Sequence, residues 1–181
     1  GFVVDDQPFV IPTIYGREND AVYLHGAAAS RMLKRLSEGI RVCLTVTHVD
    51  GLVLARSAFH HSLNYRSVVV FGVAERLSGD AKEHALFVIS EQVLKGRWDE
   101  VRPPAANELQ ATSVLRMTIE SATAKMRVGP PKDEVEDYAL PIWAGVAPIR
   151  ETFGEVIPDE ALAQEVETSP SVLALLRKGR Q

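Results

Sequence analysis

The feature that most constrains the fold of this chain is a succession of short strand-like segments, broken by turn residues, with one long helical pattern among them. Apolar runs typical of strands lie at residues 1–4, 9–15, 21–26, 41–47, 52–56, 65–75, 113–122 and 143–149. The helical pattern runs from Ser78 to about Leu94, with apolar residues spaced along one helix face. Short strands joined by tight turns predict a mainly β fold, an antiparallel barrel with peripheral helices.

The turns and the two ends of the chain carry further expectations. His48 to Gly51 ends in Asp-Gly and predicts a hairpin turn, while residues 129–137 hold two prolines and predict an ordered excursion or a lid. Short helical patterns at 161–166 and 171–178 lead us to expect one domain over 1–150 and a helical tail over 151–181. Because the chain opens within a strand-like segment, we expect further residues upstream of Gly1.

The composition excludes several classes of partner. A net charge of -4 and a pI near 5.8 argue against a polyanion binder, so we expect no nucleic-acid partner. No apolar run approaches the roughly 18 residues that cross a bilayer, and no leader pattern opens the chain, so we expect a soluble, cytoplasmic protein without a membrane partner. The single cysteine, Cys43, lies in an alternating run and predicts a small buried hydrophobe. Scattered histidines beside one cysteine predict no zinc site.

The turn from Gly26 to Arg31, GAAASR, links a strand to a short helical pattern and is a candidate anion site. Small residues let backbone amides approach a ligand, and the N-terminus of a helix offers unpaired N–H groups. Ser30 can donate a hydroxyl, and Arg31 can present a planar fork to phosphate oxygens. The alternative is a plain helix cap, in which Ser30 satisfies the first turn and Arg31 is solvated.

A second candidate region runs from Arg56 to Ser67 and includes adjacent histidines at 60 and 61. Neighbouring side chains on an extended chain point to opposite faces, so His60 and His61 do not easily share one metal ion. Either of them, or His25, could instead ligate haem iron, although no haem motif is present. Nucleophile-elbow, phosphate-loop and dinucleotide fingerprints are absent from the sequence. Trp98 and Trp143 could stack on a flat ligand or simply fill a core.

Three segments together resemble one known family. They are YLHGAAASRMLKRL at 23–36, VCLTVTHVDGLVLARSAFHHSLNYRSVVVFG at 42–72 and PIWAGVAPI at 141–149. Over roughly residues 1–149 the chain resembles the pyridoxamine 5'-phosphate oxidase-related flavin-nucleotide-binding proteins. The resemblance implies a split antiparallel β-barrel that forms a homodimer, with one FMN in each of two clefts at the subunit interface.

The resemblance also implies roles for particular residues. In the family, one strand runs beside the flavin ring, the following strand holds the cofactor, and a Ser-Arg turn binds its phosphate. A later strand contacts the flavin, often from the partner subunit, and a late tryptophan lies near the ring. The matching positions here are Val10, Pro12, Thr13, His25, Gly26, Ser30, Arg31, Tyr65, Arg66, Ser67 and Trp143. Lys125 and Arg127 are candidate substrate-side cations, with solvated strand-end charges as the alternative.

Departures from the family pattern limit what the resemblance implies about activity. Met32 follows the Ser-Arg pair where the oxidase has lysine, and PFVIPTIY replaces its Arg-x-Val-Leu-Leu-Lys strand, so we expect no vitamin B6 oxidation. The leading hypothesis is an FMN-dependent oxidoreductase that passes electrons between a small-molecule donor and acceptor. The alternatives are a non-enzymatic flavin binder or sensor, and the same barrel holding haem or the deazaflavin F420.

Overall fold

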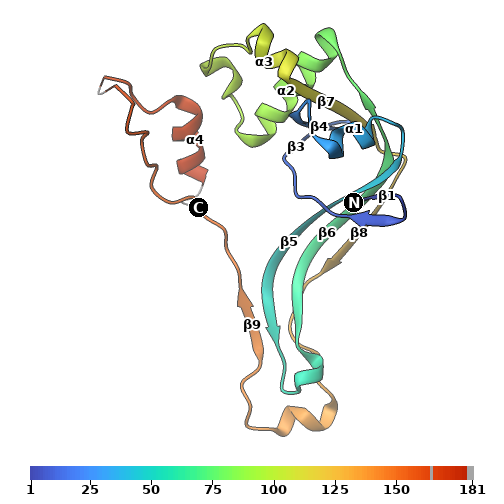
Figure 1. The fold of residues 1–181 in the computed structure, drawn as a ribbon. Helices are drawn as coiled ribbons and strands as arrows, with labels where there is room; N and C mark the ends of the chain where they lie inside the picture. Colours follow the sequence, from blue (N-terminus) through green and yellow to red (C-terminus); the bar gives the residue numbers. More distant parts are fainter. Residues whose placement is uncertain (164, 179–181) are drawn as a thin grey trace. The chain divides into compact units, whose positions relative to one another are not determined.

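The chain separates into two compact units, each assembled from segments that are distant in sequence. The computed structural model describes residues 1–163 and 165–178. Unit 1 consists of Gly1–Cys43, Phe71–Glu120 and Thr152–Gln181, and unit 2 of Leu44–Val70 and Ser121–Glu151. Two long strands, β5 (Arg41–Leu54) and β6 (Ser62–Arg76), contribute residues to both units (Figure 1). The expected domain over 1–150 with a tail over 151–181 stays a prediction.

Unit 1 contains two sets of antiparallel strands. In the first, β1 (Phe2–Val4) pairs with β2 (Gln7–Phe9) and with the start of β5. In the second, β4 (Ala21–Ala27) lies between β3 (Tyr15–Glu18) and β7 (Thr112–Thr118), and β7 also pairs with the end of β6. The first four residues of β4 and the centre of β7 are buried, as expected for strands with neighbours on both sides.

In unit 1, α1 (Arg31–Leu36), α2 (Gly79–Val93) and α3 (Ala106–Ala111) pack against the β3–β4–β7 strands. The unit also contains the 3-10 turn η2 (Trp98–Glu100) and α4 (Pro170–Lys178). The buried core between α2 and the strands comprises Ala21, Tyr23, Ala85, Val88, Ile89 and Val114. A Cβ at Gly16 on β3 would lie 2.7 Å from the backbone nitrogen of Ile89, so glycine is required where this strand meets α2.

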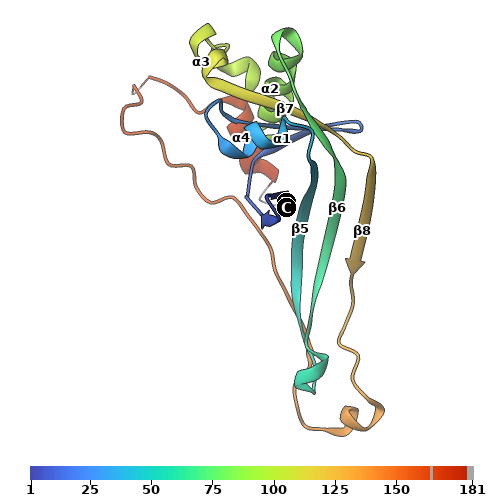
Figure 2. The same cartoon turned by 45° about the vertical axis from the view of Figure 1, so that its right-hand side comes forward.

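Unit 2 is built on a sheet in the order β9–β5–β6–β8. Strand β9 (Gly145–Pro148) pairs with Gly51–Leu54 of β5, and β8 (Ser121–Arg127) pairs with β6. The neighbouring course of β5, β6 and β8 can be followed in Figure 2. Short 3-10 turns, η1 (Ala58–His60) and η3 (Val135–Ala139), lie in the connections.

The predicted class is confirmed: the structure is mainly β, with antiparallel pairing and few helices. The strand predicted at 9–15 is wrong, because residues 10–14 form no strand and Val10 is 85% exposed. Proline has no N–H to donate to a strand ladder, and Pro12 stands in the middle of this segment. The expected location of Val10, Pro12 and Thr13 on a strand is therefore corrected to an exposed connection between β2 and β3.

The predicted hairpin turn at 48–51 is also wrong, because β5 continues through it to Leu54. A two-residue hairpin turn needs a positive φ angle, and the φ angle of Gly51 is not positive. Gly51 pairs instead with Pro148 of β9.

Three smaller predictions also differ from the structure. The strand predicted at 113–122 breaks after Thr118, and β8 begins at Ser121. Cys43 is only partly buried, not fully buried as expected. The predicted helix at 161–166 is not formed by its described residues, and its Gln164 lies outside them.

Candidate functional site

Ser30 and Arg31 line a cavity of about 520 Å³ within unit 1, which we name the Arg31 cavity. The β1–β2 hairpin supplies one wall, and α1 supplies the other. The Ser30 hydroxyl caps α1 by accepting a hydrogen bond from the Leu33 N–H at 3.4 Å. Its own proton stays available to a ligand, so the capping interpretation and the phosphate interpretation are compatible. The residues that shape the cavity most are Phe2, Phe9, Ser30, Arg31, Met32 and Arg35.

The charge in this cavity is positive and only partly neutralised. The Arg31 guanidinium carbon lies 5.7 Å from the centroid of the Phe9 ring, and no salt bridge joins Arg31 to a carboxylate within the described residues. Arg35 is held by Glu38 at 3.0 Å and by Asp5 at 3.6 Å. Helix α1 has only six residues, so its dipole is small and the attraction for an anion comes mainly from the Arg31 side chain. An aromatic wall beside a free guanidinium suits a flat ligand that carries phosphate.

His25 lines a second cavity of unit 1, of about 400 Å³, which we name the His25 cavity. Its histidine comes from β4, and its apolar walls come mainly from α2 and from the Trp98 ring. The Nδ1 atom of His25 is buried and has no hydrogen-bond partner among the described residues. Burial lowers the pKa of His25 below its ordinary value, so the imidazole is neutral near pH 7. An imidazole without a partner, facing an apolar cavity, is the arrangement expected of a ligand-binding group.

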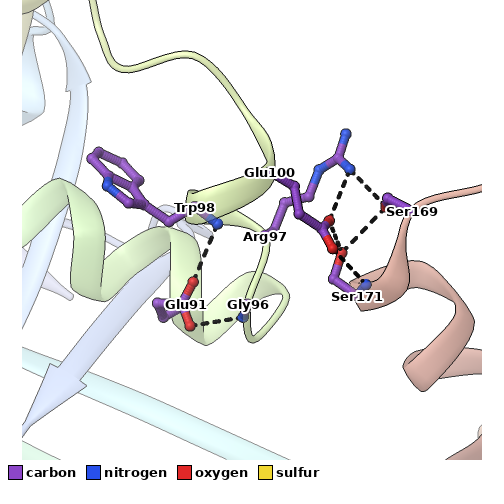
Figure 3. A network of polar contacts seen from close by, with 7 residues as sticks. All are labelled: Glu91, Gly96, Arg97, Trp98, Glu100, Ser169 and Ser171. Atoms are coloured by element: carbon purple, nitrogen blue, oxygen red, sulfur yellow. Dashed lines mark hydrogen bonds and ion pairs between the residues drawn. The ribbon is translucent and has the colours of Figure 1, made fainter.

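Polar contacts on both sides of Trp98 fix the wall of this cavity (Figure 3). The Glu91 carboxylate accepts from the backbone N–H of Gly96 at 2.8 Å and of Trp98 at 3.3 Å. Glu100 accepts from the hydroxyl and, at 2.8 Å, the backbone N–H of Ser171 at the start of α4. The Ser171 hydroxyl contributes most to lowering the pKa of Glu100 to about 2. The backbone on either side of Trp98 is therefore hydrogen-bonded to α2 through Glu91 and to α4 through Glu100.

In unit 2, the stretch from Arg56 to Asn64 is engaged in contacts that hold the following loop. The Asp133 side chain, with none of its surface exposed, accepts from the Arg56 N–H at 2.8 Å and from the Arg56 guanidinium at 3.0 Å. Burial works to raise the pKa of Asp133, but these bonds and one from the Ser57 N–H outweigh it and lower the pKa. Residues 129–137 are therefore an ordered excursion, held to the connection after β5 through Asp133 and to β6 through a bond from Asn64 to Gly129.

The histidines of this stretch have partners of their own. His61 Nδ1 accepts from the Ala55 N–H at 3.0 Å, and His60 Nε2 lies 3.4 Å from a Glu134 oxygen. Among the described residues, no group of three or more His, Cys, Asp or Glu side chains is placed to hold a metal ion.

The other residues predicted in unit 2 contact neighbouring side chains of the same unit. Arg66 donates to both oxygens of Asp50, at 2.9 Å each, and the Ser67 hydroxyl lies 2.8 Å from that of Thr47. The Lys125 ammonium lies 5.9 Å from the Tyr65 ring centroid, and Arg127 donates to Asn64 at 2.8 Å. Trp143 is 68% exposed.

The structure thus brings Ser30 and Arg31 together in one cavity, and gives His25 another. Gly26 packs against α1, where an added Cβ would be 3.1 Å from the Leu33 side chain. Sequence reasoning missed Phe9 and Arg35 as lining residues. The spacing of Arg31 and Arg35, four residues apart on a helix, is a signal that both lie on one face.

In the described part of the chain, no helix is both long and apolar enough to span a membrane.

Comparisons with known proteins give one family and two chain-long similarities. The family model for pyridoxamine 5'-phosphate oxidase matches residues 1–126. The flavocytochrome Anf3 from Azotobacter vinelandii is 41% identical, with a TM-score of 0.88 over 97% of this chain and 82% of its own. The FAD- and haem-binding protein from Mycobacterium smegmatis is 35% identical, with a TM-score of 0.92 over 96% of this chain and 86% of its own. A search of curated proteins found no match.

Proposed function

Since the chain belongs to the pyridoxamine 5'-phosphate oxidase family, we propose that it is a redox protein that binds a flavin nucleotide and a haem. The observation that carries this proposal is similarity along almost the whole chain to a flavocytochrome and to an FAD- and haem-binding protein, at 41% and 35% identity. The two cavities of unit 1 support it, because one is cationic and one is apolar with a histidine.

The Arg31 cavity holds the flavin phosphate in this proposal. Arg31 donates its planar fork to phosphate oxygens, and the Ser30 hydroxyl adds a further donor. Phe9, 5.7 Å from the Arg31 guanidinium, keeps that group directed along the cavity wall. When bound, the flavin supplies one- and two-electron redox chemistry, while the protein supplies binding and orientation.

The nucleotide is either FMN, as the family resemblance implies, or FAD. We propose FAD, because the relative from Mycobacterium smegmatis that is similar along the whole chain binds it. FAD differs from FMN by an added AMP, so mass spectrometry of the released cofactor distinguishes the two. Release of FMN alone would contradict this choice and leave flavin binding itself intact.

The residues present also fit a haem. Haem needs an apolar cavity and one neutral imidazole or similar axial ligand, and it does not need a cluster of protein ligands. The His25 cavity supplies both, because its lining is mostly apolar and the His25 imidazole on its wall has no hydrogen-bond partner among the described residues. No comparable apolar surroundings are present around His48, which is exposed on β5.

We further propose that the protein is an oxidoreductase whose small-molecule donor and acceptor meet the cofactors in a homodimer. Unit 2 exposes large apolar side chains over its strands and loops, and a second copy of the chain is a partner that can cover them. The most exposed are Phe59, Met126, Val128, Val135 and Trp143. Light scattering at micromolar concentration should give the dimer mass, and a monomer would contradict the proposal.

Of the two candidate substrate-side cations, Lys125 is exposed on β8 and remains the one to test. Arg127 is already hydrogen-bonded to Asn64.

The test of the function is the absorption spectrum of the full chain expressed with haem and riboflavin supplied. We expect a Soret band together with a flavin band, and bleaching of the flavin band by NADH or NADPH with saturating kinetics. Saturation distinguishes an enzyme from a binder or sensor, which should be reduced slowly and without saturation. A flavin band without a Soret band would contradict haem binding, a colourless protein would contradict both cofactors, and a deazaflavin peak would indicate F420.

A further inference from the structure

We propose that His25 is an axial ligand of the haem iron and that the His25 cavity is the haem site. This inference rests on the proposed function, since it assigns one of the two cofactors to a residue and a cavity.

The chain has five histidines, and their surroundings separate them. His61 already accepts a backbone hydrogen bond, and His60 and His84 face glutamates at 3.4 Å and 2.9 Å. His48 is exposed. His25 lies on a cavity wall, and neither of its ring nitrogens has a hydrogen-bond partner among the described residues. Because Nδ1 is enclosed by the protein, Nε2 is the ring nitrogen left for an iron, and the neutral imidazole can offer it a lone pair.

The walls of the His25 cavity have the chemistry that a porphyrin needs. Ile89 and Leu86 from α2 and Leu109 from α3 supply apolar surface, and the Trp98 ring supplies a flat wall. The other polar side chains on the lining are Ser90, Thr112 and Glu108, whose carboxylate is paired with Arg102, and most of the lining is apolar. At about 400 Å³ the cavity is within the usual range of about 300–1,000 Å³ for cofactor sites.

The backbone around the site is rigid enough to hold an axial ligand. His25 sits in the middle of the pairing between β4 and β7, opposite Val114, which is fully buried. Trp98, which also lines the cavity, is fixed through the Glu91 and Glu100 contacts, and Figure 3 shows its ring directed away from Ser169 and Ser171. An axial histidine on a central strand is less free to swing than one on a loop.

The Arg31 cavity is the alternative haem site, because it contains Met32, and methionine sulfur can also ligate haem iron. Its other side chains argue for an anionic nucleotide instead: Arg31 has no carboxylate partner among the described residues, and Arg35 lies on the same cavity. The two assignments, haem on His25 and haem on Met32, make opposite predictions for two single variants.

The experiment compares the wild type with His25→Gly, His25→Met and Met32→Leu, all expressed as the full chain with haem supplied. Haem per protein is measured as the pyridine haemochrome, and flavin per protein is measured after denaturation. We expect His25→Gly to lose haem by about tenfold or more while its flavin content stays within about twofold. Added imidazole should restore the Soret band of His25→Gly, because it supplies the missing nitrogen. His25→Met should retain haem with a shifted spectrum, and Met32→Leu should keep the haem content and Soret band of the wild type.

Each outcome has a distinct meaning. A Soret band that is unchanged in both His25 variants, or lost in Met32→Leu, overturns the assignment and leaves the proposed haem binding intact. Loss of flavin with retention of haem in His25→Gly also overturns it, because the cavity would then hold the flavin. A wild type without haem overturns the proposed haem binding and the assignment together. Imidazole rescue separates loss of a ligand from loss of folding, since added imidazole cannot refold a misfolded barrel.

Discussion

Ser30–Arg31 in unit 1 and Arg66–Ser67 in unit 2 consist of the same two side chains, but their surroundings differ. Arg31 lies along the Phe9 ring and has no carboxylate partner within the described residues, whereas Arg66 gives two hydrogen bonds to Asp50 at 2.9 Å each. The Ser30 hydroxyl keeps its proton for a ligand, while the Ser67 hydroxyl lies 2.8 Å from Thr47. An arginine marks an anion site only where the protein itself leaves its donors unused.

The largest effect on flavin binding is expected from Arg31→Ala. Its guanidinium is the free cation of the Arg31 cavity, and charge-assisted hydrogen bonds to phosphate are worth about 1.5–3 kcal/mol. We expect the flavin dissociation constant to rise about tenfold to a hundredfold, measured by quenching of flavin fluorescence on titration with apoprotein. Arg31→Lys is the matched control. Its flavin dissociation constant should lie between those of the wild type and Arg31→Ala, because lysine keeps the charge and loses the planar fork. An unchanged dissociation constant in Arg31→Ala would remove the phosphate assignment.

A smaller effect is expected from Phe9→Leu, which keeps the apolar wall and removes the ring beside Arg31. A cation–π contact at an exposed site is worth about 0.5–1 kcal/mol, so the flavin dissociation constant should rise about twofold to fivefold. The same titration measures it. In the Arg31→Ala background the substitution should add little, because the guanidinium is already gone; an additive loss would indicate that Phe9 contacts the flavin directly.

Arg66→Ala should change the flavin dissociation constant by no more than about twofold in the same titration. Its guanidinium is committed to Asp50, whose pKa is lowered first by the Arg66 hydrogen bond, and a phosphate would have to compete with that carboxylate. A loss as large as that of Arg31→Ala would show that Arg66 turns from Asp50 to the cofactor, as the family resemblance implies. In that case Asp50→Asn should strengthen flavin binding, because it weakens the hold of residue 50 on the Arg66 guanidinium.

Part of the fold could be predicted from sequence because its periodicity is local. Helix α2 and strand β4 carry patterns that need no knowledge of their neighbours, and both form where expected. Strand β8 has the polar sequence SATAKMR with six exposed residues of seven, and its pairing with β6 rather than its own pattern makes it a strand. The Asp-Gly pair at 50–51 is a strong local turn signal, but pairing of Gly51 with β9 keeps that segment extended.

The residues of the candidate site could likewise be predicted only where a local pattern marks them. Ser30 and Arg31 stand in a local turn and could be found as a phosphate site, whereas Phe9 reaches the same cavity only because the β1–β2 hairpin lies against α1. His25 was one of several histidines with haem chemistry in the sequence. Its buried, unpaired nitrogen and the apolar wall from α2 depend on tertiary packing, which no spacing of residues along the chain reports.

Glu100→Gln should leave flavin affinity unchanged and alter stability with pH, because Glu100 belongs to a paired network and not to the Arg31 cavity. The Ser171 hydroxyl bond lowers its pKa to about 2 from an ordinary 4.5, so the contribution is complete above pH 4.5 and is lost as the pH falls toward 2. The protection factors of the α4 amides, which compare observed exchange with the intrinsic rate at each pH, should fall with acid in the wild type. In Glu100→Gln they should already be lower at pH 7 and change less with pH, while the control Asp99→Asn, at an exposed carboxylate, should follow the wild type. Weakened flavin binding in Glu100→Gln would mean that the docking of α4 supports the flavin site. A charge that is paired within unit 1 would then contribute to flavin binding, contrary to the distinction between the free Arg31 and the paired Arg66.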